Sequence, residues 1–333
     1  AEGEKWKEIP AHPFRQGRLK EYVQKFGKDW VVQRTDSAGK ISVRLKTLAE
    51  YRPLFEEAGK FLVMQAEEIT DAYKGKPLHI GAVNVKELIG PKGGGSVTEV
   101  MQNNLDAVWE QRRRTGQPMF PHINHPNFGW AVALEDMIPL RGERFFEVYN
   151  GHPHVHNYGD QAHMGMEELW DKLQTIYLKA GKPVLYGLAT DDSHHYLEYG
   201  AGMSNPGRGW IMVRAGELTP AALIDALERG AFYSTTGVEL VDVKTEKGTL
   251  EVTVRDRPGT TYRIQFWGSS GSRTGGRILK EVKGTKASYT LKKGDLFVRA
   301  KIISSRLQQN PFQQGDYETA WTQPVTSGSV VAR

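Results

Sequence analysis

The chain has 333 residues, of which 39% are hydrophobic and 25% are charged, and it contains no cysteine. This composition is typical of a globular protein, and the lack of cysteine excludes disulfide bonds, thiolate zinc sites and cysteine nucleophiles. Lysine and arginine exceed the acidic residues by 44 − 39 = 5, and the one dense basic cluster, residues 112–114, lies at an expected helix end, which argues against a nucleic-acid partner.

No apolar run approaches the roughly 20 residues that a membrane helix requires, so we expect a soluble protein without a membrane partner. The sequence shows no signal peptide, and its compartment, cytoplasmic or exported, stays open. The chain opens with Ala1 rather than an initiating methionine, which indicates a processed or truncated product.

Strand and helix patterns alternate along the first 238 residues. Apolar or alternating runs predict the strands, and capping pairs such as Ser96 with Glu99 predict where helices begin. We therefore predict an α/β domain with parallel strands over residues 1–238. The expected strands cover residues 30–34, 41–45, 61–66, 78–83, 119–128, 145–151, 183–189 and 209–214, and the expected helices cover residues 47–59, 96–116, 166–179 and 219–230.

From about Val238 the pattern changes to alternation with period two, and Gly-rich turns separate the alternating segments. No helical periodicity is present there, so we predict a small antiparallel β-sandwich over residues 239–333. We expect this domain to have a structural role, because it carries no specific binding motif. The alternating segments are residues 250–255, 261–267, 287–291 and 296–302.

Acidic and imidazole groups follow the expected strand at residues 183–189. Asp192 and His194 are two residues apart, and an extended backbone would point both side chains the same way. A carboxylate oxygen and an imidazole nitrogen that converge on one point suit Zn²⁺, Mn²⁺ or Fe²⁺. Chemistry in parallel α/β folds lies just beyond the carboxyl ends of such strands. The pair therefore predicts part of a metal site.

Other expected strands end in similar groups. Glu68 follows the third strand, His125 ends the strand that begins at Met119, and Glu147 and Asn150 end the strand after that. Core packing does not require polar groups at several strand ends in succession. Because the carboxyl ends of parallel strands meet at one rim, we predict that these side chains form one metal centre.

Four short motifs occur in order along residues 61–238: Ala66-Glu-Glu-Ile-Thr70, His125-Pro126, Phe146-Glu-Val-Tyr-Asn-Gly151 and Thr190-Asp-Asp-Ser-His194. Their order and spacing resemble the PHP domain, the family named after polymerase and histidinol phosphatase, with its motifs G-x-E-I, H-P, E-x-x-N-G and D-x-H. More closely, the chain resembles bacterial PHP phosphoesterase-like proteins with a C-terminal β-domain, in which segments like Gly207–Trp210 and Phe232–Val238 recur.

The resemblance implies a distorted, seven-stranded relative of the TIM barrel that holds two or three divalent ions (Zn, Mn or Fe). It also implies hydrolysis of a small phosphorylated substrate by a metal-activated hydroxide. The implied metal ligands are Glu68, His79, His125, Asp192 and His194. The implied catalytic residues are His194, His152 and Arg208, and the implied substrate-binding residues are His122, Asn127, Asn150 and Arg208.

The departure from the family lies at the N-terminus. The family begins with an H-x-H strand and a D-H strand, and neither motif is present here. We therefore expect that the chain lacks its first two strand–helix units. Either a separate N-terminal fragment completes the barrel, or the N-terminal 60 residues replace the missing units, or the site is impaired. Two other functions stay open: a non-catalytic or impaired PHP-like binding protein, and an amidohydrolase-like enzyme that acts on C–N bonds. The latter often uses a strand-end lysine, and no lysine lies at a matching strand end here.

Overall fold

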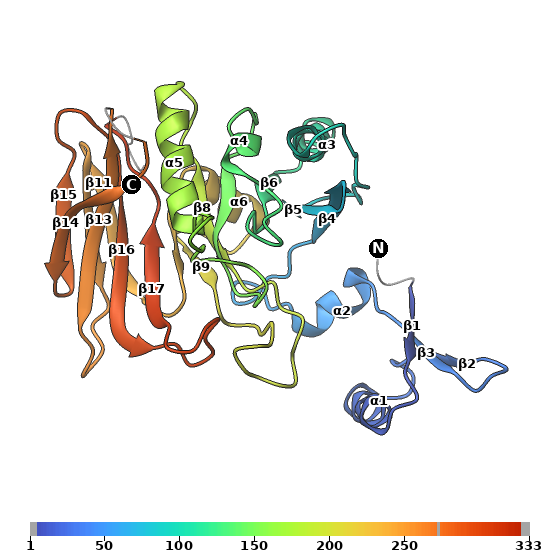
Figure 1. Cartoon of the computed structure of the whole chain (residues 1–333). Coiled ribbons are helices and arrows are strands. Elements are labelled where there is room, and N and C mark those ends of the chain that lie inside the picture. The colour runs from blue at the N-terminus through green and yellow to red at the C-terminus, as the bar shows by residue number, and fades with distance from the viewer. Residues whose placement is uncertain (1–4, 272–273, 328–333) are drawn as a thin grey trace. The chain divides into compact units, whose positions relative to one another are not determined.

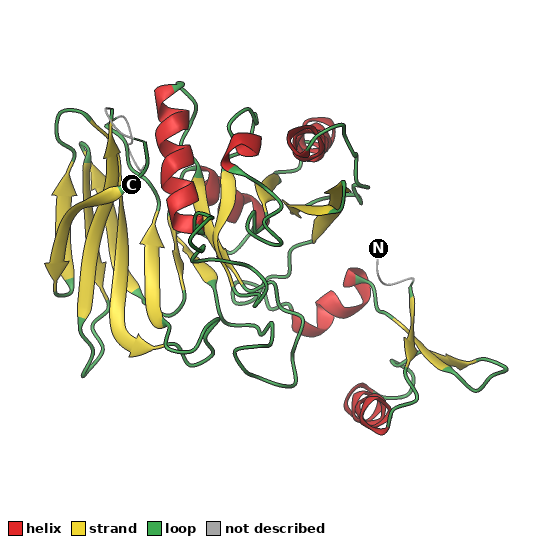
Figure 2. Cartoon of the chain, viewed as in Figure 1, coloured by secondary structure: helices red, strands yellow, loops and turns green. Residues whose placement is uncertain are grey.

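The structure is a computed structural model that describes residues 5–271 and 274–327. The chain divides into two compact units, Ala1–Gln65 and Ala66–Arg333, which we call the N-terminal and C-terminal units. Figure 1 follows the chain through both units, and Figure 2 shows that strands dominate the C-terminal unit.

The N-terminal unit is a three-stranded antiparallel sheet with two helices. The strands pair in the order β1-β3-β2. The pairing of β2 with β3 confirms the pair of strands predicted at residues 30–34 and 41–45. The predicted capping box is also confirmed, because the Thr47 hydroxyl accepts the Glu50 N–H while the Glu50 carboxylate accepts the Thr47 N–H. The elements are β1 (Trp6–Ile9), α1 (Pro13–Phe26), β2 (Gln33–Thr35), β3 (Ile41–Arg44) and α2 (Leu48–Phe55).

The first sheet of the C-terminal unit has five strands in the order β4-β5-β6-β7-β8. The β4–β5 and β5–β6 pairs are antiparallel, and the β6–β7 and β7–β8 pairs are parallel. The sheet is therefore mixed rather than parallel. Its strands are β4 (Ala66–Tyr73), β5 (Lys76–Val83), β6 (Phe120–Ile123), β7 (Phe145–Asn150) and β8 (Tyr186–Thr190).

A two-residue hairpin explains why the predicted parallel order is wrong. Lys74 and Gly75 both have positive φ angles, 48° and 81°, and they join β4 directly to β5. Two such residues form the hairpin turn that matches strand twist, so the second strand returns antiparallel without a crossover helix. The run 61–66 is not a strand apart from its last residue, and β4 continues through Glu68, which therefore lies inside a strand and not at a strand end.

Helices cover this sheet where the capping signals predicted them. Ser96 caps the helix α3, and Thr219 caps α6, in which Pro220 is the first residue. α3 packs on β4, β5 and β6, and α5 packs on β7. No helix among the described residues is both long and apolar enough to cross a lipid bilayer. The four helices of this unit are α3 (Val97–Thr115), α4 (Leu134–Met137), α5 (Met166–Lys179) and α6 (Pro220–Glu228).

The remaining strands form two antiparallel sheets, one in the order β14-β13-β16-β17-β10-β9 and one in the order β11-β12-β15. The six-stranded sheet takes strands from both sides of residue 238, the predicted domain boundary. The strands are β9 (Trp210–Val213), β10 (Phe232–Thr235), β11 (Leu240–Glu246), β12 (Thr249–Val254), β13 (Tyr262–Ser270), β14 (Arg277–Lys283), β15 (Lys286–Thr290), β16 (Asp295–Leu307) and β17 (Tyr317–Thr322).

The predicted α/β TIM-like barrel is therefore wrong. Strands make up 34% of the chain and helices 20%, and the strands lie in several separate sheets, none of which closes into a barrel. The predicted helices at α3, α5 and α6 are confirmed. A pattern of alternating strands and helices does not, however, show whether two successive strands are joined by a parallel crossover or by a hairpin. The expected separate N-terminal fragment stays a prediction.

Helix α5 packs on both β7 of the five-stranded sheet and on β13 and β16 of the six-stranded sheet, and Figure 1 shows it between them. A buried ion pair joins α5 to β16. The Arg299 guanidinium donates to both carboxylate oxygens of Asp171, at 2.7 and 2.8 Å, and lies 3.3 Å from the Glu167 carboxylate. Arg299 is 1% exposed and lies over the ring of Trp170, which also belongs to α5. The charge of the Arg299 guanidinium is therefore shielded from water.

Candidate metal centre

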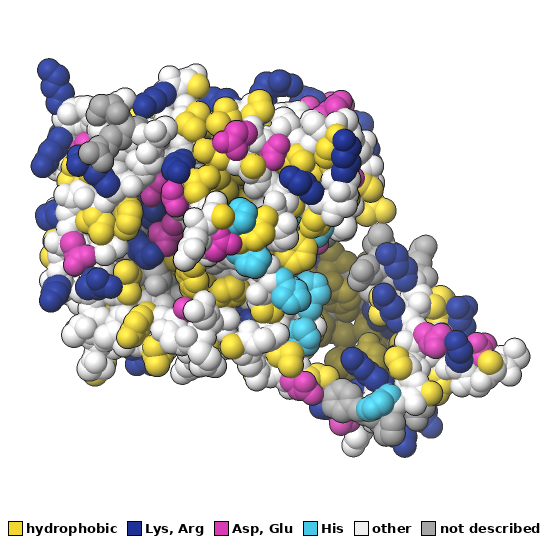
Figure 3. All heavy atoms as spheres, viewed as in Figure 1, with side chains coloured by type: hydrophobic (Ala, Val, Ile, Leu, Met, Phe, Trp, Pro, Cys, Tyr) yellow, Lys and Arg dark blue, Asp and Glu magenta, His cyan; other side chains and the backbone are white. Residues whose placement is uncertain are grey.

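Three side chains from consecutive strands of the five-stranded sheet converge on one point. Glu68 lies on β4, His79 lies on β5, and His125 follows β6. His79 Nδ1 lies 3.2 Å from Glu68 Oε1 and 3.3 Å from His125 Nε2, and His125 Nε2 lies 3.5 Å from Glu68 Oε1. These three residues form a group of possible metal ligands. Figure 3 shows histidine side chains gathered on this unit, with acidic and hydrophobic side chains between them.

The antiparallel register brings the three residues together. Glu68 lies opposite Gly81, and the next position on the same face of β5 is His79. Asn124, in the segment that follows β6, holds this segment against β4 and β5 through two hydrogen bonds. Its amide nitrogen donates to Glu68 Oε1 at 2.8 Å, and its oxygen accepts the Gly81 N–H at 2.8 Å. Asn124 was not predicted, and its only sequence signal is its place next to His125.

The spacing of the three ligand atoms fits a divalent ion. Zinc bonds to nitrogen and oxygen are about 2.0–2.2 Å long, so the ligand atoms of a tetrahedral ion lie about 3.3–3.6 Å apart. The three distances between Glu68, His79 and His125 are 3.2, 3.3 and 3.5 Å. One carboxylate and two imidazoles are also the ligand types that zinc, manganese and iron accept. The residues present therefore fit the predicted ion.

Asp192 also approaches the imidazole of His125. Its Oδ2 atom is 3.8 Å from His125 Nε2, and its Oδ1 atom is 3.7 Å from His194 Nδ1. The backbone there is not extended as predicted, because β8 ends at Thr190 and Asp192 has a φ of 47°. The His194 ring bonds the Asp192 carbonyl oxygen at 2.8 Å, and the side chain of His194 is 63% exposed. Asp192 thus lies between two imidazoles and is the second carboxylate of the site, after Glu68.

A second layer of polar groups holds the backbone of His125 and the carboxylate of Asp192. Glu147 is buried, and its Oε2 atom accepts the His125 backbone N–H at 2.8 Å and an Asn150 amide N–H at 2.9 Å. The same Asn150 nitrogen lies 3.4 Å from Asp192 Oδ2. Groups of this kind orient ligands and tune their basicity. The sequence predicted a substrate contact for Asn150, and the structure shows it bonded within this layer.

The cluster shifts the pKa values of its members in opposite directions. Burial alone would raise the pKa of Glu68, but hydrogen bonds from His125 and His79 hold it below its ordinary value. Burial alone would lower the pKa of His125, but the hydrogen bond to Glu68 and the charge of Glu147 raise it. The negative carboxylates therefore favour a cation at this position, whether a proton or a metal ion.

His122 lies next to this cluster without joining it. Gly81 is its partner across the β5–β6 pair, and a Cβ atom on Gly81 would lie 2.0 Å from His122 Nε2. Both ring nitrogens of His122 are buried and have no hydrogen-bond partner among the described residues. Burial lowers the pKa of His122 to about 4. The ring is therefore neutral near pH 7, and the missing side chain of Gly81 provides its space.

Replacing Gly81 by Ala is expected to destabilise the protein by about 1–3 kcal/mol, because the new methyl group overlaps the His122 ring. The double variant Gly81→Ala/His122→Ala removes that overlap, so it should be less destabilised than the sum of the two single variants by about 0.5–3 kcal/mol. Urea unfolding of the four proteins measures this coupling. Strict additivity would show that the two residues do not share this space.

Phe128 lies among three imidazole rings. Its ring centroid is 6.2 Å from that of His79, 5.2 Å from that of His125 and 5.9 Å from that of His152. The His152 ring in turn lies 5.4 Å from the His194 ring. His152 is half-buried, and burial lowers its pKa. The structure thus places His152, predicted as catalytic, beside the ligand cluster, and it places Phe128 there as well.

Two predicted residues serve the surrounding loops. The Arg208 guanidinium is buried and donates to the carbonyl oxygens of Gly151, Met203 and Gly200. The Asn127 amide donates to the carbonyl oxygens of His156 and Met164, both at 2.9 Å. These contacts fix loops that follow β7 and β8. The predicted contact of Arg208 and Asn127 with substrate stays a prediction.

Comparison with known proteins found no similar protein. No family model matches the chain, and neither the curated proteins nor the solved structures contain a match to it.

Proposed function

We propose that the chain is a divalent-metal-dependent hydrolase that acts on phosphate esters. The single observation that supports metal binding most strongly is the set of ligand distances, 3.2, 3.3 and 3.5 Å, between Glu68, His79 and His125. Asp192, at 3.8 Å from His125 Nε2, is the next ligand in reach. The choice of phosphate esters rests on the sequence motifs that resemble those of PHP proteins.

A divalent ion in such a site acts as a Lewis acid and lowers the pKa of a coordinated water molecule. The chain's own residues supply the rest. Glu68, His79 and His125 would hold the ion, and Glu147 would orient His125 through its backbone N–H. His194 is 63% exposed, so its imidazole can reach the leaving oxygen of a substrate and transfer a proton to it. We do not assign Arg208 to phosphate, because carbonyl oxygens engage its guanidinium.

The test is turnover by the full chain after its metals are removed with a chelator and Zn²⁺, Mn²⁺ or Fe²⁺ is restored singly. Substrates are p-nitrophenyl phosphate, bis(p-nitrophenyl) phosphate and a panel of amides. Phosphate-ester turnover that depends on metal and is lost in Glu68→Gln supports the proposal. Turnover of amides alone would favour an enzyme that acts on C–N bonds, and metal binding without turnover would favour a binding protein. Either result overturns the phosphoesterase assignment.

Metal affinity is expected to rise as the pH is raised from about 6 to about 8, by up to about tenfold per pH unit for each proton released. The pKa of His125 is raised by Glu68, so below that pKa its imidazole carries a proton that the metal must displace. Above the pKa the affinity should level off. Competition with a chelator of known affinity measures this profile. An affinity that does not change with pH would show that His125 is not a ligand.

A further inference from the structure

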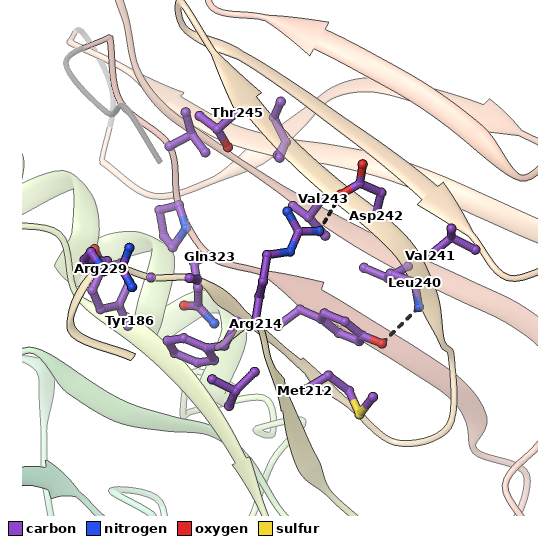
Figure 4. A pocket seen from close by; sticks show the side chains of 18 residues that line it. Tyr186, Met212, Arg214, Arg229, Leu240, Val241, Asp242, Val243, Thr245 and Gln323 are labelled. Carbon is purple, nitrogen blue, oxygen red and sulfur yellow. Dashed lines mark hydrogen bonds and ion pairs between the residues drawn. The ribbon is translucent and has the colours of Figure 1, made fainter. Parts of the chain in front are cut away.

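A cavity of about 510 Å³ lies in the C-terminal unit, and none of its lining residues belongs to the metal centre. Its walls come from β9, β10, β11 and the segment after β17 (Figure 4). Small-molecule sites in proteins have volumes of about 300–1,000 Å³ and mostly apolar walls with a few polar groups. The cavity lies within that range.

Two local contacts position the walls of the cavity. Gly230 has a φ of 70°, and a Cβ atom there would lie 2.7 Å from the Tyr186 ring, so only glycine lets the turn after α6 pass this close. The Tyr233 hydroxyl accepts the Leu240 N–H at 2.9 Å, which fixes the start of β11 against β10. These contacts position two edges of separate sheets, β9 and β11, on either side of one space.

The walls are predominantly apolar. The amide of Gln323 bonds both the N–H and the carbonyl oxygen of Gly187 on β8, at 2.8 and 2.9 Å, so its polar atoms are already engaged. Arg229, at the rim, is held by an ion pair of 2.7 Å with Asp225 on α6. The apolar lining residues include Met212, Phe232, Leu240, Val243, Leu250 and Val325.

One charged side chain extends across this apolar space. Figure 4 shows Arg214 extending from the end of β9 toward Asp242 on β11, to which its guanidinium donates a hydrogen bond. Arg214 is 61% exposed and Asp242 is 27% exposed, and exposed ion pairs of this kind contribute little stability. Asp242 has a second cation, Lys244, at 3.4 Å. An incoming anion can therefore take the place of Asp242 on Arg214 while Lys244 still neutralises Asp242.

We propose that this cavity binds a small amphipathic carboxylate, such as a medium-chain or aryl-alkyl acid. The apolar body lies against Met212, Leu240 and Val243, and the carboxylate accepts the N–H groups of Arg214. A guanidinium offers a planar fork that matches the two oxygens of a carboxylate. The proposal does not depend on the metal centre, and it holds whether or not the chain hydrolyses phosphate esters.

Isothermal titration calorimetry of the full chain with decanoate, and with 1-decanol as its neutral counterpart, tests this site. We expect decanoate to bind more tightly than decanol, with a negative heat-capacity change that reports apolar burial. Arg214→Gln should weaken decanoate at least about tenfold and leave decanol unchanged, because it removes a charge-assisted hydrogen bond. The matched control is Arg255→Gln: Arg255 is also 61% exposed and ion-paired, with Glu239, but lies outside the cavity.

Two variants test whether the ligand binds inside the cavity or on its rim. Met212→Trp and Val243→Trp fill the space, and each should abolish binding of both probes; Met212 is 41% exposed, so its variant disturbs the core less. Circular dichroism and thermal unfolding confirm that each variant folds. The proposal is overturned if wild-type protein binds neither probe, if Arg214→Gln and Arg255→Gln bind decanoate equally well, or if folded Met212→Trp retains full binding.

Discussion

Replacing His125 by Ala is expected to lower the affinity for a divalent ion by more than about 100-fold and to abolish any metal-dependent turnover. His125 Nε2 lies 3.3 Å from His79 Nδ1, 3.5 Å from Glu68 Oε1 and 3.8 Å from Asp192 Oδ2, so it is the atom that the other candidate ligands share. Removal of a group that only supports a ligand lowers metal affinity by about 10–100-fold, and removal of a ligand itself lowers it further. Chelator competition and metal analysis measure the loss.

A graded set of variants separates ligation from folding. Glu147→Gln keeps an oxygen that can accept the His125 N–H but removes the charge, so it should lower metal affinity by about 10–100-fold or less. His163→Ala is the matched histidine control, because His163 is half-exposed and paired with Asp160 away from the ligand group. Metal affinity that falls equally in His125→Ala and His163→Ala would contradict the assignment of His125 as a ligand.

The second large effect concerns stability. Arg299→Ala is expected to lower the free energy of unfolding by about 3–5 kcal/mol, because it leaves the Asp171 carboxylate buried without its cation. Asp171 is 3% exposed and receives two hydrogen bonds from Arg299. A backbone also approaches closely, since a Cβ atom on Gly276 would lie 2.1 Å from Asp171 Oδ2. Rearrangement of α5 to let water reach the carboxylate is therefore restricted.

Denaturant unfolding of metal-free protein checks this prediction against two controls. Arg299→Met/Asp171→Leu removes both charges, and it should recover most of the lost stability because no unpaired charge remains. Arg263→Ala removes an exposed pair with Glu281, at 3.9 Å, and should change the stability by less than about 1 kcal/mol. If Arg299→Ala costs no more than Arg263→Ala, the ion pair does not fasten α5 to β16.

Local signals in the sequence predicted local structure well. The capping residues Thr47, Ser96 and Thr219 begin helices as expected, because a hydroxyl that accepts an N–H within its own helix needs no distant partner. The ligand group also contains three of the predicted metal residues, Glu68, His79 and His125. Residue type and position near expected strand ends singled out Glu68 and His125, whereas His79 came only from the resemblance to PHP proteins.

The arrangement of the strands was not predictable in the same way. Lys74-Gly75 is a weak hairpin signal, and a Lys with a φ of 48° is unusual, so β4 and β5 were expected as separate parallel strands. The predicted position of Glu68 at the end of a parallel strand was therefore wrong, because Glu68 lies inside the antiparallel strand β4. Asn124 could not be identified, because its role comes from contacts with Glu68 and Gly81 and not from any motif.

The most direct test of the metal centre is an anomalous difference map from crystals of the full chain grown with Zn²⁺ or Mn²⁺. The account predicts a peak about 2.0–2.3 Å from Glu68 Oε1, His79 Nδ1 and His125 Nε2, with Asp192 as the next nearest carboxylate. A map with no peak among these atoms, or with a fully bound ion held elsewhere in the C-terminal unit, would contradict it.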